Sequence, residues 1–186
     1  FIYTTVHSPS TTTAPLPLLH QRSAKMVAGS FTVEYQSPVS VERLWKGGVC
    51  DGHILAPKIL PEVYASIDVV EGDGGVGTIM QFNFTEAVEG WKFVTERFDV
   101  IDEENHTVKY TVVGGGLLHS RLKAYSFEVK FEAADNGGSK GKVTVDYDTI
   151  SDSPLTEEEC GKLTFASSTT LKALESYLQE NPNLYA

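Results

Sequence analysis

The feature that most constrains the fold is an alternation of apolar and polar residues that runs, segment after segment, from Tyr64 to Ile150. A period of two is typical of strands that bury one face of a sheet. None of the breaks between the segments has room for the helix that connects parallel strands, so the sequence predicts an antiparallel meander. The breaks are rich in glycine and aspartate and lie at residues 72–77, 102–105, 114–116 and 135–138.

A strand and two short helices are expected before the meander. Residues 31–35 alternate like a strand, and Ser37-Pro38 then provides a helix start for residues 41–46. A second short helix is expected at residues 53–59, and Gly47-Gly48 is expected to break the chain between the two helices. In the first strand of the meander, the apolar positions expected to share the buried face are Ala65, Ile67 and Val69.

The C-terminal segment changes to the period of a helix. Thr156 followed by Glu159 is a helix-start signal, and apolar residues then recur at intervals of three and four from Leu163 to Leu178. One long helix is therefore expected, ending before Pro182. It is the main element available to cover the concave face of six or seven antiparallel strands, so the fold class is α+β.

Two interpretations of the space between sheet and helix stay open at this point. The middle of the helix carries small side chains where a packed core would need Leu or Phe, which favours an apolar cavity lined by strand aromatics. Aromatic strand residues more often interdigitate into a solid core, and the pattern alone favours that alternative. The small helix residues are Ala166, Ser167, Ser168, Thr170 and Ala173.

Length and composition indicate one folded domain. The chain has 186 residues, enough for one well-cored domain and too few for two. Residues 1–25 contain no acidic residue and include a low-complexity stretch of Ser, Thr and Pro. We expect them to be a disordered extension upstream of a natural start at Met26, and we expect a single domain at residues 26–186.

The domain is strongly acidic. It holds all 25 acidic residues but only 13 of the 15 basic ones, because Arg22 and Lys25 precede it, and its net charge is therefore near −12. Such a surface repels phosphate backbones and anionic membranes, so neither nucleic acid nor a membrane is expected as a partner. No stretch approaches the roughly 20 apolar residues of a membrane-spanning helix. We expect a cytoplasmic, monomeric protein.

Metal and cofactor sites are not indicated. Cys50 and Cys160 lie far apart without a CxxC spacing, and His53, His106 and His119 show no ligand spacing with them or with one another. We therefore expect free thiols, no metal and no cofactor.

The glycine-rich loop formed by Gly72, Asp73, Gly74, Gly75 and Gly77 satisfies the GxGxxG pattern of nucleotide-binding proteins. Phosphate cradles of that kind open a helix, whereas this loop precedes an alternating segment, and Thr78 stands where a Walker loop has lysine. Asp73 would also repel a phosphate. The loop is expected to be a hairpin connection whose glycines adopt positive φ.

Several short strings, together with the order of the expected elements, identify a family. The strings are Arg43-Leu44-Trp45-Lys46, Pro57-Lys58, Glu71–Ile79, Gly115-Gly116 and Glu175-Ser176-Tyr177-Leu178. From Met26 to the C-terminus the chain resembles the class 10 pathogenesis-related proteins of plants, the birch-pollen major allergen family. The resemblance implies a helix-grip fold, in which seven strands and two short helices enclose a large cavity under the long helix.

The resemblance also implies a function, and it makes the cavity the preferred interpretation. It implies non-catalytic binding and storage of hydrophobic plant metabolites or hormones, such as cytokinins, flavonoids, brassinosteroids or compounds like abscisic acid, in defence or stress responses. Gly48 and Ala56 stand where close relatives often have aromatics, which implies a wider cavity or entrance. The predicted ligand contacts are Met80, Phe82, Phe84, Phe93, Val108, Tyr110, Val112, Tyr125, Phe127, Leu163, Ala166 and Thr170.

Enzymatic alternatives rest on few residues. The related norcoclaurine synthases use four polar cavity residues, and of the matching positions Val94, Glu96, Val108 and Phe127 only Glu96 can act as acid or base. Glu96 is thus a weak catalytic candidate, and a carboxylate that pairs with Arg97 or with solvent at the strand edge is the more ordinary expectation. Family members proposed as ribonucleases have a lysine and a glutamate where this chain has Met80 and Lys123, so ribonuclease activity is not expected.

Overall fold

The computed structural model describes residues 26–186 apart from Asn136. The predicted disordered extension at residues 1–25 lies outside the described residues. Eleven elements follow one another along the described chain: β1 Ala28–Ser37, α1 Val41–Trp45, η1 Lys46–Cys50, α2 Gly52–Ile59, β2 Tyr64–Glu71, β3 Ile79–Phe84, β4 Phe93–Asp102, β5 Thr107–Gly115, β6 Leu122–Ala133, β7 Ser139–Thr149 and α3 Glu157–Glu180.

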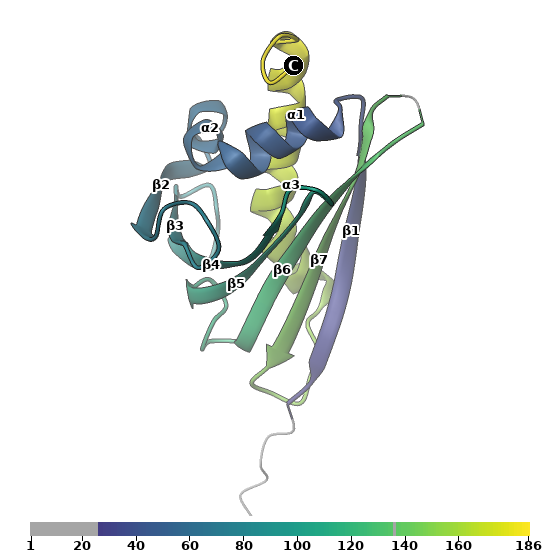
Figure 1. Cartoon of the computed structure of the whole chain (residues 1–186). Coiled ribbons are helices and arrows are strands. Elements are labelled where there is room, and N and C mark those ends of the chain that lie inside the picture. The colour runs from purple at the N-terminus through teal and green to yellow at the C-terminus, as the bar shows by residue number, and fades with distance from the viewer. Residues whose placement is uncertain (1–25, 136) are drawn as a thin grey trace, which may run out of the picture.

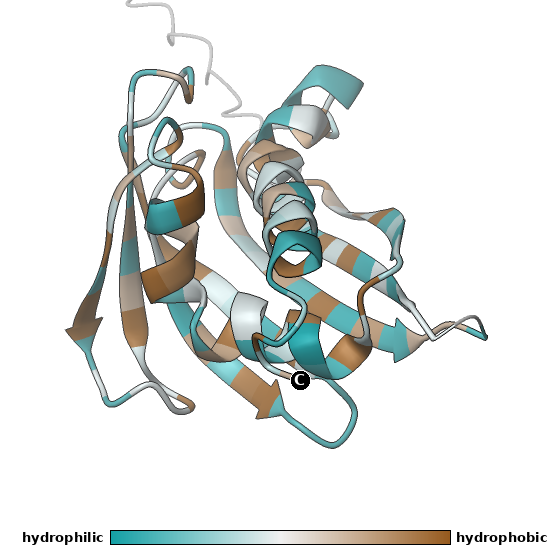
Figure 2. Ribbon diagram, turned by 90° about the horizontal axis from the view of Figure 1, so that it is seen from above, coloured by the Kyte–Doolittle hydropathy of each residue, from teal (hydrophilic) through white to brown (hydrophobic). Residues whose placement is uncertain are grey.

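The seven strands form one antiparallel sheet in the order β1-β7-β6-β5-β4-β3-β2. Each strand from β2 to β7 pairs with its neighbour in sequence, and β1 closes the series against β7. The sheet curves around α3, and α1 and α2 lie across one end (Figure 1). Viewed from that end, α3 runs inside the curve of the sheet (Figure 2). The predicted α+β helix-grip architecture is confirmed.

The two short helices expected here are present, but the Gly47-Gly48 segment between them is a π-helical turn rather than a break in the helical chain. The chain continues from α1 through the π-helical turn η1, at Lys46–Cys50, and then enters α2 at Gly52. A Cβ atom on Gly47 would lie 3.0 Å from a Leu174 methyl group, and one on Gly48 would lie 3.1 Å from another. The two glycines therefore allow the turn to approach α3 closely rather than ending a helix.

A bulge shifts the alternation in β2. The pairing of β2 with β3 is irregular between Tyr64 and Ser66 and again near the end of the strand. Tyr64 is buried, whereas Ala65 is exposed and Val69 is 45% exposed. The expectation that Ala65 and Val69 share the buried face is therefore wrong, because a bulge changes the face that later residues occupy.

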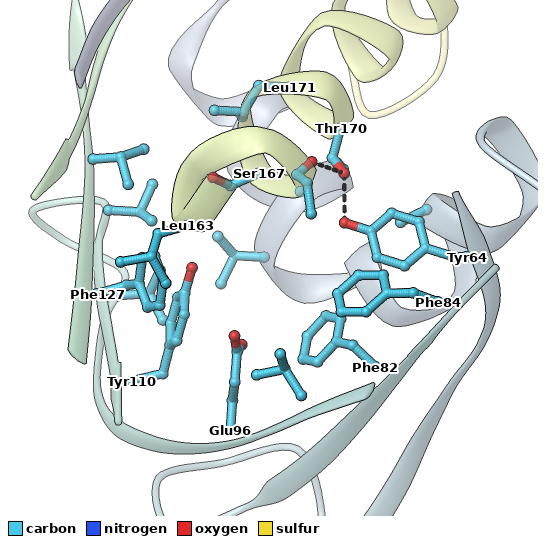
Figure 3. Close-up of a pocket in the computed structure, with 18 of the residues that line it drawn as sticks. Tyr64, Phe82, Phe84, Glu96, Tyr110, Phe127, Leu163, Ser167, Thr170 and Leu171 are labelled. Carbon is cyan, nitrogen blue, oxygen red and sulfur yellow. Dashed lines mark hydrogen bonds between the residues drawn. The ribbon is translucent and has the colours of Figure 1, made fainter. Parts of the chain in front are cut away.

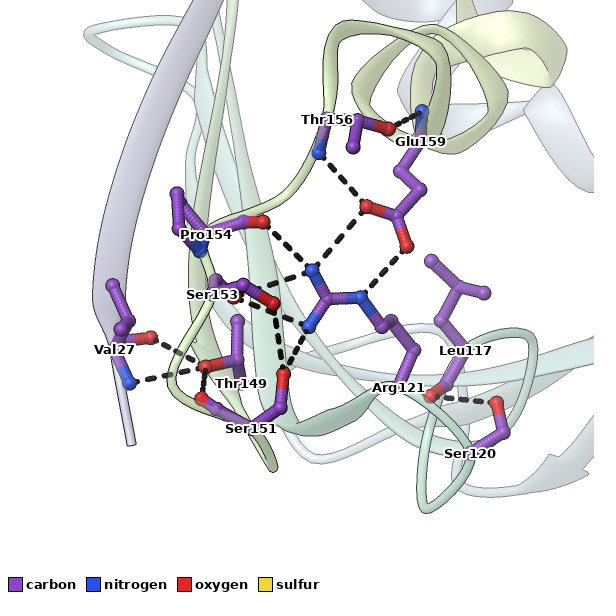
Figure 4. Close-up of polar contacts among 10 residues, drawn as sticks. All are labelled: Val27, Leu117, Ser120, Arg121, Thr149, Ser151, Ser153, Pro154, Thr156 and Glu159. Carbon is purple, nitrogen blue, oxygen red and sulfur yellow. Dashed lines mark hydrogen bonds and ion pairs between the residues drawn. The ribbon is translucent and has the colours of Figure 1, made fainter. Parts of the chain in front are cut away.

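The beginning of α3 is held by a network around Arg121, in the turn before β6 (Figure 4). Its guanidinium group donates to a Glu159 carboxylate oxygen over 2.7 Å and to the Pro154 carbonyl oxygen over 2.7 Å. Glu159 and Thr156 also form a reciprocal capping box, which confirms this predicted start signal. Hydrogen bonds from Arg121 lower the pKa of the Glu159 carboxyl.

The other end of α3 is held by Arg43 of α1. Its guanidinium group donates to the carbonyl oxygens of Leu178 and Asn181, both over 2.8 Å, and to that of Leu184 over 2.9 Å. Carbonyl groups at a helix C-terminus lack partners within the helix, and a cation there also interacts favourably with the helix dipole. Arginines from two distant segments therefore fix both ends of α3.

We expect Arg121→Ala to destabilise the protein by about 2 kcal/mol, because it removes a charge-assisted network that is mostly shielded from solvent. Urea unfolding at neutral pH measures this loss. The difference in free energy of unfolding from the wild type should become smaller at acid pH. The Glu159 carboxyl, whose pKa is lowered in the folded protein, stabilises the fold only while it is ionised.

Arg97→Ala is the matched control. Arg97 pairs with Asp99 and its side chain is 46% exposed, so its removal should change the free energy of unfolding by less than about 0.5 kcal/mol. Equal losses in the two variants would show that the Arg121 network does not anchor α3.

Candidate ligand-binding cavity

A cavity of about 180 Å³ lies between the concave face of the sheet and α3 (Figure 3). Its wall is mainly apolar and aromatic, the composition typical of small-molecule sites. The lining residues are Gly48, Val49, Ala56, Tyr64, Phe82, Phe84, Val88, Trp91, Val94, Glu96, Phe98, Val108, Tyr110, Tyr125, Phe127, Val129, Phe131, Val143, Lys162, Leu163, Ala166, Ser167, Thr170, Leu171 and Leu174.

The cavity exists because the middle of α3 does not reach the sheet. Leu174 and Leu178, toward the C-terminal end of the helix, are almost completely buried. Ala166, Ser167 and Thr170, nearer the middle, line the open space instead. Since both ends of α3 are anchored, the helix cannot move inward to fill this space. The solid core that the pattern alone favoured is therefore wrong, and the cavity inferred from the small helix residues is present.

Aromatic rings build the floor of the cavity. The rings of Tyr110 and Phe127 stack with centroids 5.2 Å apart, and Phe98 meets Tyr110 edge to face. On the opposite side, Tyr64 packs at a tilt against Phe84, with centroids 5.6 Å apart. These contacts preorganise the wall, so that a ligand would meet formed surfaces.

Three of the hydroxyl groups in the wall have hydrogen-bond partners within the protein. The Thr170 hydroxyl donates to the Ala166 carbonyl oxygen over 2.8 Å, so it accepts from the Tyr64 hydroxyl, also at 2.8 Å. The Tyr125 hydroxyl accepts from the Leu117 amide over 3.3 Å. By contrast, no described residue forms a hydrogen bond with the Tyr110 hydroxyl, which points into the cavity (Figure 3).

Glu96 of β4 also directs its carboxyl group into the cavity (Figure 3). Its cross-strand neighbours are Met80 of β3 and Val112 of β5, whose side chains cannot donate a hydrogen bond. Burial raises the pKa of this carboxyl from 4.5 to about 8. The expected pairing of Glu96 with Arg97 is wrong, because adjacent strand residues face opposite sides and Arg97 pairs with Asp99 at 2.8 Å.

Most of the predicted contact residues are brought together at the cavity. Met80 and Val112 are buried beside Glu96 but do not line the space. The prediction for Phe93 is wrong: the residue is 41% exposed, because Val94 takes the inward position and Phe93 faces outward. Those that line the cavity are Phe82, Phe84, Val108, Tyr110, Tyr125, Phe127, Leu163, Ala166 and Thr170.

Sequence reasoning missed several lining residues. Phe98 follows Val94 and Glu96 at intervals of two, so a strict alternation from Val94 would have found it. Tyr64 was left out of the buried face, which was assigned to Ala65, Ile67 and Val69, and the bulge after Tyr64 left no signal in the sequence. Gly48 and Ala56, noted for their small size, do line the cavity.

The glycine-rich loop connects β2 to β3 and uses its amide groups internally. The Gly77 amide donates to the Phe98 carbonyl oxygen over 2.7 Å, and the Gly74 amide donates to the Thr78 hydroxyl over 2.9 Å. Gly72, Gly74 and Gly77 have φ values of 92–99°. These features support the interpretation of the loop as a hairpin connection and not as a phosphate cradle.

Across residues 26–186 without Asn136, no group of three or more His, Cys, Asp and Glu side chains is placed to hold a metal ion. In the same part of the chain, no helix is long and apolar enough to span a membrane. Cys50 and Cys160 are free thiols.

Comparison with known proteins gives consistent matches. Residues 26–181 match the family model described as the pathogenesis-related protein Bet v 1 family. Pathogenesis-related protein 1 of Asparagus officinalis is 36% identical over 160 residues, which cover 86% of this chain and 99% of that protein. The crystal structure of Ara h 8.0201 superposes with a TM-score of 0.73 at 38% identity, over 83% of this chain and 99% of the other.

A more distant likeness concerns the fold alone. Norcoclaurine synthase from Thalictrum flavum, solved in complex with dopamine and hydroxybenzaldehyde, superposes with a TM-score of 0.68. Its identity is 20%, over 93% of this chain and 98% of the other.

We expect Glu96→Gln to stabilise the protein relative to the wild type, increasingly so between pH 4.5 and pH 8. The unfolded wild type loses its Glu96 proton near pH 4.5, whereas the folded protein keeps it to about pH 8, so stability falls across this window. The difference should approach about 5 kcal/mol and then become constant. Urea unfolding of both proteins at pH 5, 7 and 9 measures it.

Glu104→Gln provides the control, because Glu104 is exposed in the turn between β4 and β5. Glu104→Gln should change the free energy of unfolding only slightly, and this change should not increase between pH 4.5 and pH 8. If Glu96→Gln behaved like this control, the carboxyl of Glu96 would be solvated and not isolated in the cavity.

Proposed function

Because the chain belongs to the Bet v 1 family of pathogenesis-related proteins, we propose that it binds and stores small hydrophobic plant metabolites or hormones in its cavity without converting them. The observation that carries the proposal is a preformed apolar space beneath an anchored helix. Cytokinins, flavonoids, brassinosteroids and compounds like abscisic acid are the candidate classes.

The apolar area that a ligand buries sets the scale of its affinity. A ligand that buries about 300 Å² of apolar surface gains about 7 kcal/mol at about 25 cal/mol/Å². Association entropy opposes this gain, so dissociation constants of tens of micromolar or weaker are expected. Such affinities suit a reversible store, because the ligand is released when its free concentration falls.

The setting that we propose is the defence or stress response of a plant. Relatives named as pathogenesis-related proteins and as allergens support this setting. We further propose that the protein acts as a cytoplasmic monomer and has no nucleic-acid partner, since its net charge of −10 disfavours an anionic partner.

A neutral fluorescent probe, N-phenyl-1-naphthylamine, tests the proposal. We expect saturable enhancement of its emission, with displacement by members of at least one candidate class. Ser167→Phe should weaken probe binding about tenfold or more, because Ser167 lines the cavity and a phenyl ring there would occupy ligand space.

Ser176→Phe is the matched control on the exposed face of α3, and it should leave probe binding unchanged. Thermal unfolding would verify that both variants are folded. Equal affinity in the two variants would place the probe outside the cavity, and the absence of saturable binding to the wild type would refute the proposed function.

A cavity enzyme that uses Glu96 is the second candidate. The observation that favours it is the raised pKa of this carboxyl, at about 8, which suits a group that exchanges protons near neutral pH. Against it, the neighbouring positions Val94, Val108 and Phe127 offer no second acid or base. We therefore place it behind non-catalytic binding.

Incubation with a plant metabolite extract separates the two candidates. If the protein is a binder, mass spectrometry should show bound compounds after desalting and no new product that depends on the protein. A product that forms with the wild type and with Glu104→Gln, but not with Glu96→Gln, would favour the enzyme instead.

A further inference from the structure

Among the described residues that line the cavity, only Glu96 carries a carboxyl group and only Lys162 carries an amino group. Lys162 does not neutralise Glu96: its ammonium group lies 2.8 Å from a Glu158 carboxylate oxygen, and its side chain is 48% exposed. The Glu96 carboxyl has no described hydrogen-bond partner and is flanked by Met80 and Val112. A buried carboxyl in such surroundings is costly unless another molecule satisfies it.

We propose that Glu96 selects ligands that carry an aliphatic amine on a compact apolar body, and that the Glu96 carboxylate binds the ammonium group. The inference rests on the proposed function, since it names the class of ligand that the cavity holds.

The surroundings of Glu96 suit an ammonium group. The Tyr110 hydroxyl points into the same space and is free to accept a second N–H (Figure 3). Phe82 lies on the other side of Glu96 in that view, and aromatic faces attract cations. A charge-assisted hydrogen bond between N⁺–H and a carboxylate is also about twice as strong as a neutral one.

Other ligand chemistries fit this position less well. A carboxylic acid would bring a second negative charge toward Glu96, and two carboxylates in an apolar site cannot both ionise without a large loss of free energy. A neutral alcohol gains only an ordinary hydrogen bond. The geometry therefore ranks amines above matched alcohols, and alcohols above matched acids.

Binding of the amine is coupled to proton release. Below pH 8 Glu96 is mainly protonated, so an ammonium ligand displaces one proton when the ion pair forms. The dissociation constant should fall about tenfold per pH unit from pH 6 until it levels near pH 8, while the amine itself, with a pKa of about 10, stays charged.

Other groups that face Glu96 do not titrate in this range. Burial raises the pKa of Tyr64 from β2, Tyr110 from β5 and Tyr125 from β6, so all three stay protonated. The pKa of Lys162 from α3 is raised by Glu158, so it stays charged. The parts of η1, α2 and β3 that line the cavity are apolar.

Displacement of N-phenyl-1-naphthylamine tests the inference with three matched competitors, 2-(2-naphthyl)ethylamine, 2-(2-naphthyl)ethanol and 2-naphthylacetic acid. At pH 8 we expect the amine to bind the wild type about tenfold or more tightly than the alcohol. Glu96→Gln should reduce that preference to less than about threefold, whereas Glu104→Gln should keep it. Calorimetry at pH 7 in two buffers of different ionisation enthalpy should show release of about one proton.

The outcomes separate this inference from the proposed function. Failure of the probe to bind the wild type would overturn both. Binding of the probe and the alcohol without a preference for the amine, or an amine preference that persists in Glu96→Gln, would overturn the inference alone. An amine affinity that falls from pH 6 to pH 8 would mean that a protonated Glu96 donates to the ligand, and this too would overturn it.

Discussion

The position of α3 is the constraint on which the rest of the structure depends. Arg121 joins its first turn to the β7–α3 connection, and Arg43 binds the carbonyl groups at its end. Between these anchors, Leu174 and Leu178 pack into the core while Ala166 and Ser167 do not reach the sheet. A helix that was free to shift would close that space, since protein interiors otherwise approach close packing. The cavity thus results from strong contacts at both ends and small side chains between them.

The open space and the isolated carboxyl both oppose folding. Unfilled cavities cost roughly 24 cal/mol per Å³ in mutational series, so 180 Å³ corresponds to about 4 kcal/mol of forgone packing. Glu96 lowers the free energy of unfolding further at any pH at which its carboxyl is ionised in the unfolded chain but not in the folded chain. A ligand that fills the space and satisfies the carboxyl restores both terms, so stability and binding are linked at this site.

The sequence predicts the strands and the long helix of this protein better than it predicts the cavity between them. Alternation and the capping box at Thr156 and Glu159 report local backbone geometry, so the strands and the long helix could be predicted. Bulges and close approaches depend on distant partners: the bulge after Tyr64 depends on β3, and the π turn at Gly47-Gly48 depends on Leu174. Arg97 beside Glu96 suggested an ion pair, although neighbours along a strand face opposite sides. The prediction for Phe93 failed for the same reason: its neighbour Val94 faces the cavity, so Phe93 faces outward.

Affinity and selectivity come from different parts of the cavity wall. Hydrophobic contacts distinguish ligands weakly, because one methylene changes the binding free energy by about 1–3 kcal/mol, and aromatic walls accept many shapes. A polar group that must be matched discriminates more sharply, since a ligand without the complementary group leaves it buried and unpaired. In this cavity Tyr64 and Tyr125 already have partners within the protein, whereas Glu96 and Tyr110 do not. The rings can therefore hold many apolar bodies of similar size, and the two unsatisfied groups decide which polar end enters with them.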